Sequence, residues 1–222
     1  MEDAKQTDIQ ALILKLDSLL GARPQAGVVE TLGEARRVEA IPYFIRALED
    51  DACRSAAEEA LSKLGSHARA ALVETALARA PSAQEEPLAS LRRRRSALEL
   101  LAKMLLPRHI WRVLRPCLEE NDPGIVTAVT RIALKPGCGS LDDKRFAVHR
   151  LLTLLSSADS SAQEQIENCL VGHYKDVRTY LEEEFVQRHR AWNPKNGANP
   201  MVPMLLRISR LADEKFSKKR EE

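Results

Sequence analysis

Apolar residues recur every three or four positions along almost the whole chain, which is the spacing of an amphipathic helix. The first predicted helix shows this pattern at Ile9, Leu12, Ile13, Leu16, Leu19 and Leu20. No segment sustains the alternation of apolar and polar residues that a half-buried strand requires. Clusters of Gly, Pro and acidic residues interrupt the pattern at short intervals. The sequence therefore predicts consecutive antiparallel helices joined by turns.

These breaks divide the chain into helical hairpins followed by two further helices. The hairpins are expected at 7–20 with 24–33, 38–48 with 52–64, 66–80 with 87–105, 107–120 with 123–134, and 141–156 with 161–173. A single helix is expected at 175–190, and the Asn- and Pro-rich segment 191–203 is expected to be a loop. Residues 204–222 then form a terminal helix with a charged tail.

One hairpin cannot bury its apolar stripe alone, whereas stacked hairpins share a continuous core. We therefore expect residues 1–190 to form one elongated all-α domain, an α-α superhelix or solenoid of antiparallel hairpins. A solenoid of this kind curves and presents an extended concave face, and such faces bind other macromolecules.

The clearest hairpin lies between residues 33 and 65. Its acidic turn, residues 49–51, can cap the second helix because carboxylates accept hydrogen bonds from unpaired N–H groups. The second helix places small residues inward, which lets neighbouring backbones approach closely. We expect Ala57, Ala60 and Leu61 to be buried at a contact between helices.

This segment, VEAIPYFIRALEDDACRSAAEEALSKLG, resembles one HEAT repeat of the phycobilisome-lyase-like subclass. The matching features are Ala40-Ile41-Pro42, Ala47-Leu48, Asp50, Arg54, and the ending Ala60-Leu61 with Leu64-Gly65. The resemblance covers about 30 residues, and elsewhere it rests on hairpin length. An arginine in the place of Arg54 often pairs with the acidic turn of a neighbouring hairpin in such repeats.

The resemblance implies two functions of different classes. Because the repeat occurs in many unrelated interaction proteins, the first hypothesis is a non-catalytic scaffold or adaptor that binds a protein partner. The alternative is a bilin lyase- or isomerase-like subunit, since relatives in this subclass attach, remove or isomerise bilins on phycobiliproteins. A gain of bilin absorbance on mixing the chain with phycocyanobilin and phycobiliprotein would separate the two.

Composition narrows the class of protein. A hydrophobic content of 44% with 30% charged residues is typical of a folded chain, and aromatic residues make up only 4%. No apolar run approaches the roughly 18 residues that span a bilayer, and residues 1–20 do not resemble a signal sequence. We expect a cytoplasmic protein without membrane contact, whose oligomeric state the sequence leaves open. The dispersed cysteines are expected to be buried free thiols.

The four arginines at 92–95 stand in one predicted helix, whose expected apolar stripe consists of Leu88, Leu91, Leu98, Leu101 and Leu105. Since successive helical residues turn by about 100°, these side chains fan around the helix and cannot all face one ligand. Arg95 lies four residues after Leu91, so we expect it near the helix contact, close to Glu99, and expect the other three to point outward.

Arginines on consecutive helices form the candidate binding surface: Arg92, Arg93, Arg108, Arg112 and Arg115. Residues 66–155 carry fifteen basic and nine acidic side chains, whereas residues 1–65 carry eight and twelve. This asymmetry favours an acidic protein partner whose binding weakens as salt rises, with nucleic acid as a third hypothesis. An ordinary solvated helix face explains the same residues.

Two further candidate sites involve Trp192 and a cysteine with two histidines. Trp192, at the start of the 191–203 loop, is either an exposed anchor for a partner or a lid folded on the last hairpin. Cys169 and His173 share one helix face, with His149 on a neighbouring helix, but no further ligand completes a metal set at short spacing.

Catalytic signatures are not found in the sequence. It contains no phosphate-binding glycine loop, nucleophile elbow or HExxH pair. The acidic pairs at 58–59 and 182–184 are expected on solvated helix faces, where they favour solubility. We expect no catalytic residues, metal or cofactor.

Overall fold

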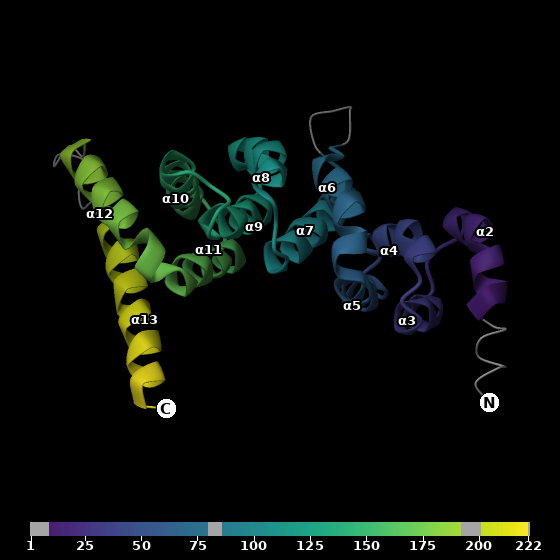
Figure 1. Cartoon of the computed structure of the whole chain (residues 1–222). Helices are drawn as coiled ribbons and strands as arrows, with labels where there is room; N and C mark the ends of the chain where they lie inside the picture. The colour runs from purple at the N-terminus through teal and green to yellow at the C-terminus, as the bar shows by residue number, and fades with distance from the viewer. Residues whose placement is uncertain (1–8, 80–85, 192–200, 222) are drawn as a thin grey trace. The chain divides into compact units, whose positions relative to one another are not determined.

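The computed structural model describes residues 9–79, 86–191 and 201–221, and these residues form helices joined by turns, with no strand among them (Figure 1). Twelve α-helices, α2 to α13, have both ends within this part of the chain. The predicted all-α class is therefore confirmed. Contacts divide the chain into two compact units, residues 1–106 and residues 107–222, which are described separately below.

The first unit contains six α-helices and two short 3-10 helices. They are α2 (Leu16–Gly21), α3 (Ala26–Glu34), η1 (Val38–Ala40), α4 (Ile41–Ala47), α5 (Arg54–Leu64), η2 (Gly65–Ala68), α6 (Arg69–Leu77) and α7 (Leu88–Lys103). Pro42 occupies the first turn of α4, where its missing N–H needs no partner. Residues 9–14 are also helical.

Helices of the first unit pack in two rows. Consecutive helices contact each other in the pairs α4 with α5 and α6 with α7. In addition, α4 contacts both α2 and α6, and α5 contacts both α3 and α7, so equivalent helices of successive hairpins lie side by side (Figure 1). This pattern is the layering expected when hairpins share one apolar core.

Helices α3 and α5 approach each other closely at Gly33 and Ala60. A Cβ atom added to Gly33 would lie 2.7 Å from the Cβ atom of Ala60, so the two backbones are close together only because both residues are small. Ala57, Ala60 and Leu61 are buried there, as the sequence predicted.

The second unit contains the remaining helices. They are α8 (Arg108–Leu114), η3 (Arg115–Glu119), α9 (Pro123–Leu134), α10 (Leu141–Leu155), α11 (Ser160–Gly172), α12 (Tyr174–Ala191) and α13 (Met201–Glu221). Contacts of η3 with α10 and of α10 with α12 form one row, and contacts of α9 with α11 and of α11 with α13 form the other. Figure 1 shows α12 and α13 adjacent at the end of this unit.

Local sequence explains where several of these helices begin. The carboxylates of Asp122 and Asp159 accept hydrogen bonds from backbone N–H groups of the first turns of α9 and α11. Ser140 and Asp143 form a reciprocal capping box at the start of α10. The helix after each of these caps has several buried apolar residues.

Some expectations about helix faces and ends were wrong. Leu88 and Leu105 belong to the stripe expected inside α7, but they are 56% and 90% exposed because one is the first residue of the helix and the other lies beyond its end. The terminal helix begins at Met201, inside the segment expected to be a loop. Pro203 fits there because a proline is tolerated in a first helical turn.

Candidate functional site

Charged side chains gather around the acidic turn of the first unit. The carboxylate of Asp50 lies 2.7 Å from Arg23 Nε and also accepts a hydrogen bond from the backbone N–H of Ala52 at 2.9 Å. These two hydrogen bonds lower the pKa of Asp50. Asp50 is therefore held both by its own turn and by the preceding hairpin.

The neighbouring acids of the turn bind arginines of α7. Arg92 Nη1 lies 2.8 Å from Asp51 Oδ2, and Arg93 pairs with Glu49. Both arginines are half-buried, and they join this turn to the next hairpin. Arg54 also contacts the acidic turn, but it pairs with Asp51 of its own hairpin. The neighbouring hairpins supply Arg23, Arg92 and Arg93 instead.

Arg94 is the buried member of the arginine run, contrary to the expectation that it points outward. It is 1% exposed, its Nη1 lies 2.6 Å from Glu86 Oε2, and its Nε donates to the carbonyl of Ala76 at 2.9 Å. A buried guanidinium needs such partners because desolvation of an uncompensated charge is costly. Arg95, which was expected at the helix contact, is half-buried.

Three further candidate arginines lie in the second unit, where Arg108 and Arg112 belong to α8 and Arg115 begins η3. All three side chains are exposed, whereas Trp111 and Leu114 on the same helix are buried. In the described ranges, Arg108 and Arg112 have no hydrogen bond or ion pair to another side chain. They thus differ from Arg92 and Arg93, which both pair with carboxylates of the acidic turn.

Asp143 is the centre of a hydrogen-bond cluster that holds α8 against α10. Its carboxylate accepts the indole N–H of Trp111 at 3.0 Å and lies 2.8 Å from Arg115 Nε. It also accepts the hydroxyl and backbone N–H of Ser140 at 2.9 and 3.0 Å. Burial alone would raise the pKa of Asp143, but these hydrogen bonds outweigh it and lower the pKa to about 2.

Asp143→Asn is expected to remove the part of the pH dependence of stability that Asp143 contributes. Because the folded-state pKa lies below the ordinary 3.8, the ionised form contributes stability above about pH 4, and this contribution is lost as pH falls toward 2. The shift corresponds to about 2 kcal/mol at neutral pH. Urea unfolding at pH 7, 5, 4 and 3 measures the free energy of unfolding. The difference in this free energy between wild type and variant should shrink as pH falls.

The matched control is Asp142→Asn, which removes the same charge from the same turn. The Asp142 side chain is 93% exposed, so its loss should change the free energy of unfolding little. Stability curves of wild type and Asp143→Asn that stay parallel from pH 7 to pH 3 would contradict the proposed role of Asp143.

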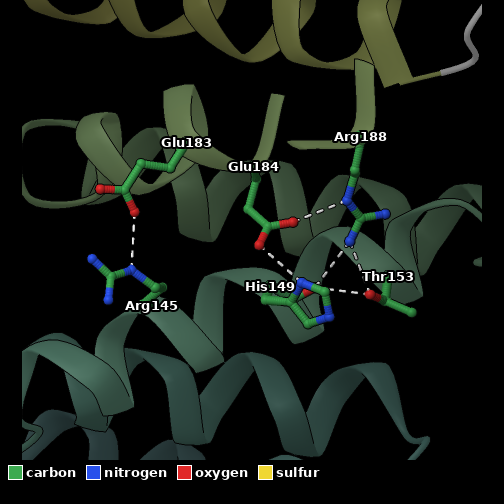
Figure 2. A network of polar contacts seen from close by, with 6 residues as sticks. All are labelled: Arg145, His149, Thr153, Glu183, Glu184 and Arg188. Carbon is green, nitrogen blue, oxygen red and sulfur yellow. Dashed lines mark hydrogen bonds and ion pairs between the residues drawn. The ribbon is translucent and has the colours of Figure 1, made fainter. Parts of the chain in front are cut away.

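A second polar network joins α10 to α12 (Figure 2). The Glu184 carboxylate lies 2.9 Å from His149 Nδ1 and 3.0 Å from Arg188 Nε. Arg188 Nη2 donates to Thr153 Oγ1 at 3.0 Å, and the Thr153 hydroxyl donates to the His149 carbonyl at 2.9 Å. The Thr153 hydroxyl donates its proton to the backbone carbonyl of His149, so the His149 ring does not act as a base that would make Thr153 a nucleophile. The network is instead suited to holding the two helices together.

Glu184 was expected on a solvated face, but it is 5% exposed. Its neighbour Glu183 binds Arg145 Nε at 2.9 Å beside the same network, as Figure 2 shows. The expected solvated face is correct for Glu182, which is exposed. Helical phase is the sequence signal that could have separated these residues. Glu184 lies three residues after the apolar Leu181 and so shares its buried side of the helix, whereas Glu182 lies on an exposed side.

The cysteine and histidine candidates for a metal site are not brought together. Cys169 is buried, and the Nδ1–H of His173 donates to the Cys169 carbonyl at 3.0 Å. His149 binds Glu184 instead. Over residues 9–79, 86–191 and 201–221, no three potential metal ligands cluster. All four cysteines are buried free thiols, as predicted.

A groove of about 320 Å³ between α12 and α13 was not anticipated from the sequence. Its walls include Leu181, Phe185 and Val186 of α12, and Val202, Leu205 and Leu206 of α13. Leu206 is 66% exposed and Val186 is 43% exposed. The hydroxyls of Tyr174 and Ser209 meet at 3.1 Å in the same groove. The groove is therefore an accessible apolar surface with a polar contact in its lining.

The remaining candidate, Trp192, lies outside the described residues. Among the helices that are described, none combines the length and apolar character needed to cross a membrane.

Comparison with known proteins gives no further assignment. No family model matches the chain, and neither a curated protein nor a solved structure matches it.

Proposed function

We propose that this chain is a non-catalytic scaffold of HEAT-like helical hairpins, and that it binds an amphipathic helix of another protein in the groove between α12 and α13. The observation that carries the proposal is the pair of exposed apolar side chains, Leu206 and Val186, that line this groove from opposite helices. Apolar side chains placed in this way are the usual receptor for the apolar face of a helix.

The charges beside the groove also favour an apolar ligand. Arg178 and Glu182 line it, and their side chains pair at 2.8 Å. Because they compensate each other, the groove has little net charge with which to select a charged ligand. The occupant therefore needs apolar anchors, and an amphipathic helix supplies these at every third or fourth position.

The ion pairs of three carboxylates, of which Glu184 is buried and the other two are partly buried, support a structural rather than a catalytic role for the polar clusters. Glu86 pairs with Arg94, Asp143 with Arg115, and Glu184 with Arg188. Each of these acids is already neutralised by an arginine of the same unit. A general acid or base needs a proton that it can exchange with a substrate, so these groups are better suited to joining helices.

The HEAT-like assignment is part of the proposal and rests on two features. The segment that resembles a HEAT repeat folds as the hairpin of α4 and α5, with small residues at the contact between α5 and α3. Its acidic turn binds arginines of the preceding and following hairpins. An extended solenoid with a partner-binding face follows from this assignment.

The test uses Leu206→Glu and a site-specific photo-crosslinker at position 206. In a lysate of the source organism, the crosslinker should label an amphipathic helical segment of one protein, and a synthetic peptide of that segment should bind the purified chain. Burial of one leucine contributes about 1.5 to 3 kcal/mol, so Leu206→Glu should weaken peptide binding at least tenfold.

Leu141→Glu is the matched control because Leu141 is 71% exposed in the same unit, at the start of α10. A glutamate in that first turn is favourable to the helix. This variant should bind the peptide as the wild type does. Equal losses in both variants, or identical crosslinked products from positions 206 and 141, would show that the groove is not the docking site.

A further inference from the structure

One side of α8 and the start of η3 carries a row of exposed arginines. Arg108, Arg112 and Arg115 stand at positions i, i+4 and i+7, which places them along one side of a helix over about 10 Å. Trp111 and Leu114 point into the core from the same segment. The buried side chains hold this segment so that the arginines face solvent.

The last arginine of the row is fixed by its surroundings. Arg115 Nε lies 2.8 Å from Asp143 Oδ1, and the guanidinium carbon lies 5.7 Å from the centre of the Phe146 ring. The side chain nevertheless remains about half exposed. Because these contacts already restrict the Arg115 side chain, it loses little further side-chain entropy when a ligand binds.

The other two arginines carry charge that the described part of the chain does not compensate. Arg108 and Arg112 have no ion pair within residues 9–79, 86–191 and 201–221, although most of the arginines discussed above have one. Arginine binds carboxylates through a planar, bidentate fork. Two such side chains one helical turn apart match two carboxylates with the same spacing.

Negative charge at the end of the row limits the length of an anionic ligand. Glu119 is exposed and lies 4.0 Å from Arg115, and Glu120 follows it at the end of η3. A long polyanion such as nucleic acid would meet these carboxylates if it continued along the helix. Proteins that bind duplex DNA through phosphates commonly use about six to ten contacts, which this short row cannot provide.

We propose that Arg108 and Arg112, with Arg115 beside them, bind a short acidic segment of a protein partner that carries carboxylates one helical turn apart. Val113, 46% exposed next to Arg112, supplies an apolar contact for a residue between those acids. The proposal concerns a different surface from the α12–α13 groove, and it does not require that the groove binds a helix.

The probe is a helical peptide with glutamates at i and i+4 and a leucine between them, titrated into the ¹⁵N-labelled full chain. We expect amide shifts at His109, Arg112 and Val113. The double variant Arg108→Ala with Arg112→Ala should weaken binding at least tenfold. Raising the salt concentration from about 50 to 200 mM should also weaken binding, because exposed charge pairs are screened over about 8 Å at physiological salt.

Control variants test whether a loss of peptide binding comes from this surface and not from misfolding, from a change in net charge or from the groove. Arg108→Lys with Arg112→Lys should retain part of the affinity, and charge reversal at the exposed Arg79 and Arg190 should leave it unchanged. Leu206→Glu should also bind the acidic peptide normally, so failure of the groove and failure of the arginine row give different results. Circular dichroism checks the fold of each variant.

Two results would overturn the proposal. One is peptide binding that is absent, or that is equal in the wild type and the folded Arg108→Ala, Arg112→Ala variant. The other is a single-stranded oligonucleotide that shifts the same amides and binds more tightly than the peptide, which would make the row a nucleic-acid surface.

Discussion

Glu86→Ala is expected to lower the free energy of unfolding of the first unit by about 3 kcal/mol or more. Glu86 lies 2.6 Å from Arg94, whose side chain is 1% exposed, so the variant takes a carboxylate away from a buried guanidinium. Breaking a buried ion pair from one side costs about 3 to 5 kcal/mol because the remaining charge stays desolvated. Chemical denaturation followed by circular dichroism measures the loss.

Two variants test this explanation. Arg92→Ala removes an arginine of the same helix that is about one-third exposed and pairs with Asp51, so it should cost less than about 1 kcal/mol. Replacing both Glu86 and Arg94 by leucine should recover much of the stability, since two apolar residues leave no buried charge. If Glu86→Ala and Arg92→Ala have the same small effect, the pair with Arg94 is not important for stability.

Trp111→Ala is expected to lower the free energy of unfolding of the second unit by about 3 to 5 kcal/mol. Trp111 is 2% exposed, and deletion of a large buried ring leaves a cavity that the surrounding helices fill only in part. The variant also removes the indole hydrogen bond to Asp143, which holds α8 near α10. The measurement is again denaturant unfolding at neutral pH.

Trp111→Phe separates these two contributions. Phenylalanine retains most of the buried ring but has no N–H donor, so this variant should cost about 1 to 2 kcal/mol, mainly from the lost hydrogen bond and a smaller cavity. It should also reduce the pH dependence attributed to Asp143, because one of the groups that lower its pKa is missing. A Trp111→Ala variant as stable as wild type would exclude the buried position of this side chain.

The candidate arginines show how far sequence reasoning extends. The 100° turn per residue correctly implied that Arg92 to Arg95 could not share one ligand. It did not identify the buried residue, which is Arg94. Arg95 was expected at the helix contact because it lies four residues after Leu91, but Arg94, three residues after Leu91, is on the same side of the helix. The face of a helix that becomes buried depends on its neighbours, and here those neighbours include the residues around Glu86 and Ala76.

Features of the second unit that the sequence did not reveal join residues far apart in the chain. Glu184 pairs with His149, 35 residues earlier, because α12 packs on α10, the first helix of the previous hairpin. The α12–α13 groove likewise combines residues on both sides of the 192–200 segment. A local pattern shows that each helix is amphipathic, but it does not show which two helices leave a groove between them.

The sequence by itself determined the all-helical class, most helix positions and the burial of Ala57, Ala60 and Leu61 at a contact between helices. These features are local, since helical periodicity, caps and the size of a side chain act within one or two turns of the chain. Only the tertiary structure decided which charges are neutralised. Arg92 and Arg93 have carboxylates of a neighbouring hairpin within reach, whereas Arg108 and Arg112 have none in the described residues. An ion pair depends on the distance between side chains after the helices have packed, and the spacing of residues along the chain does not contain that distance.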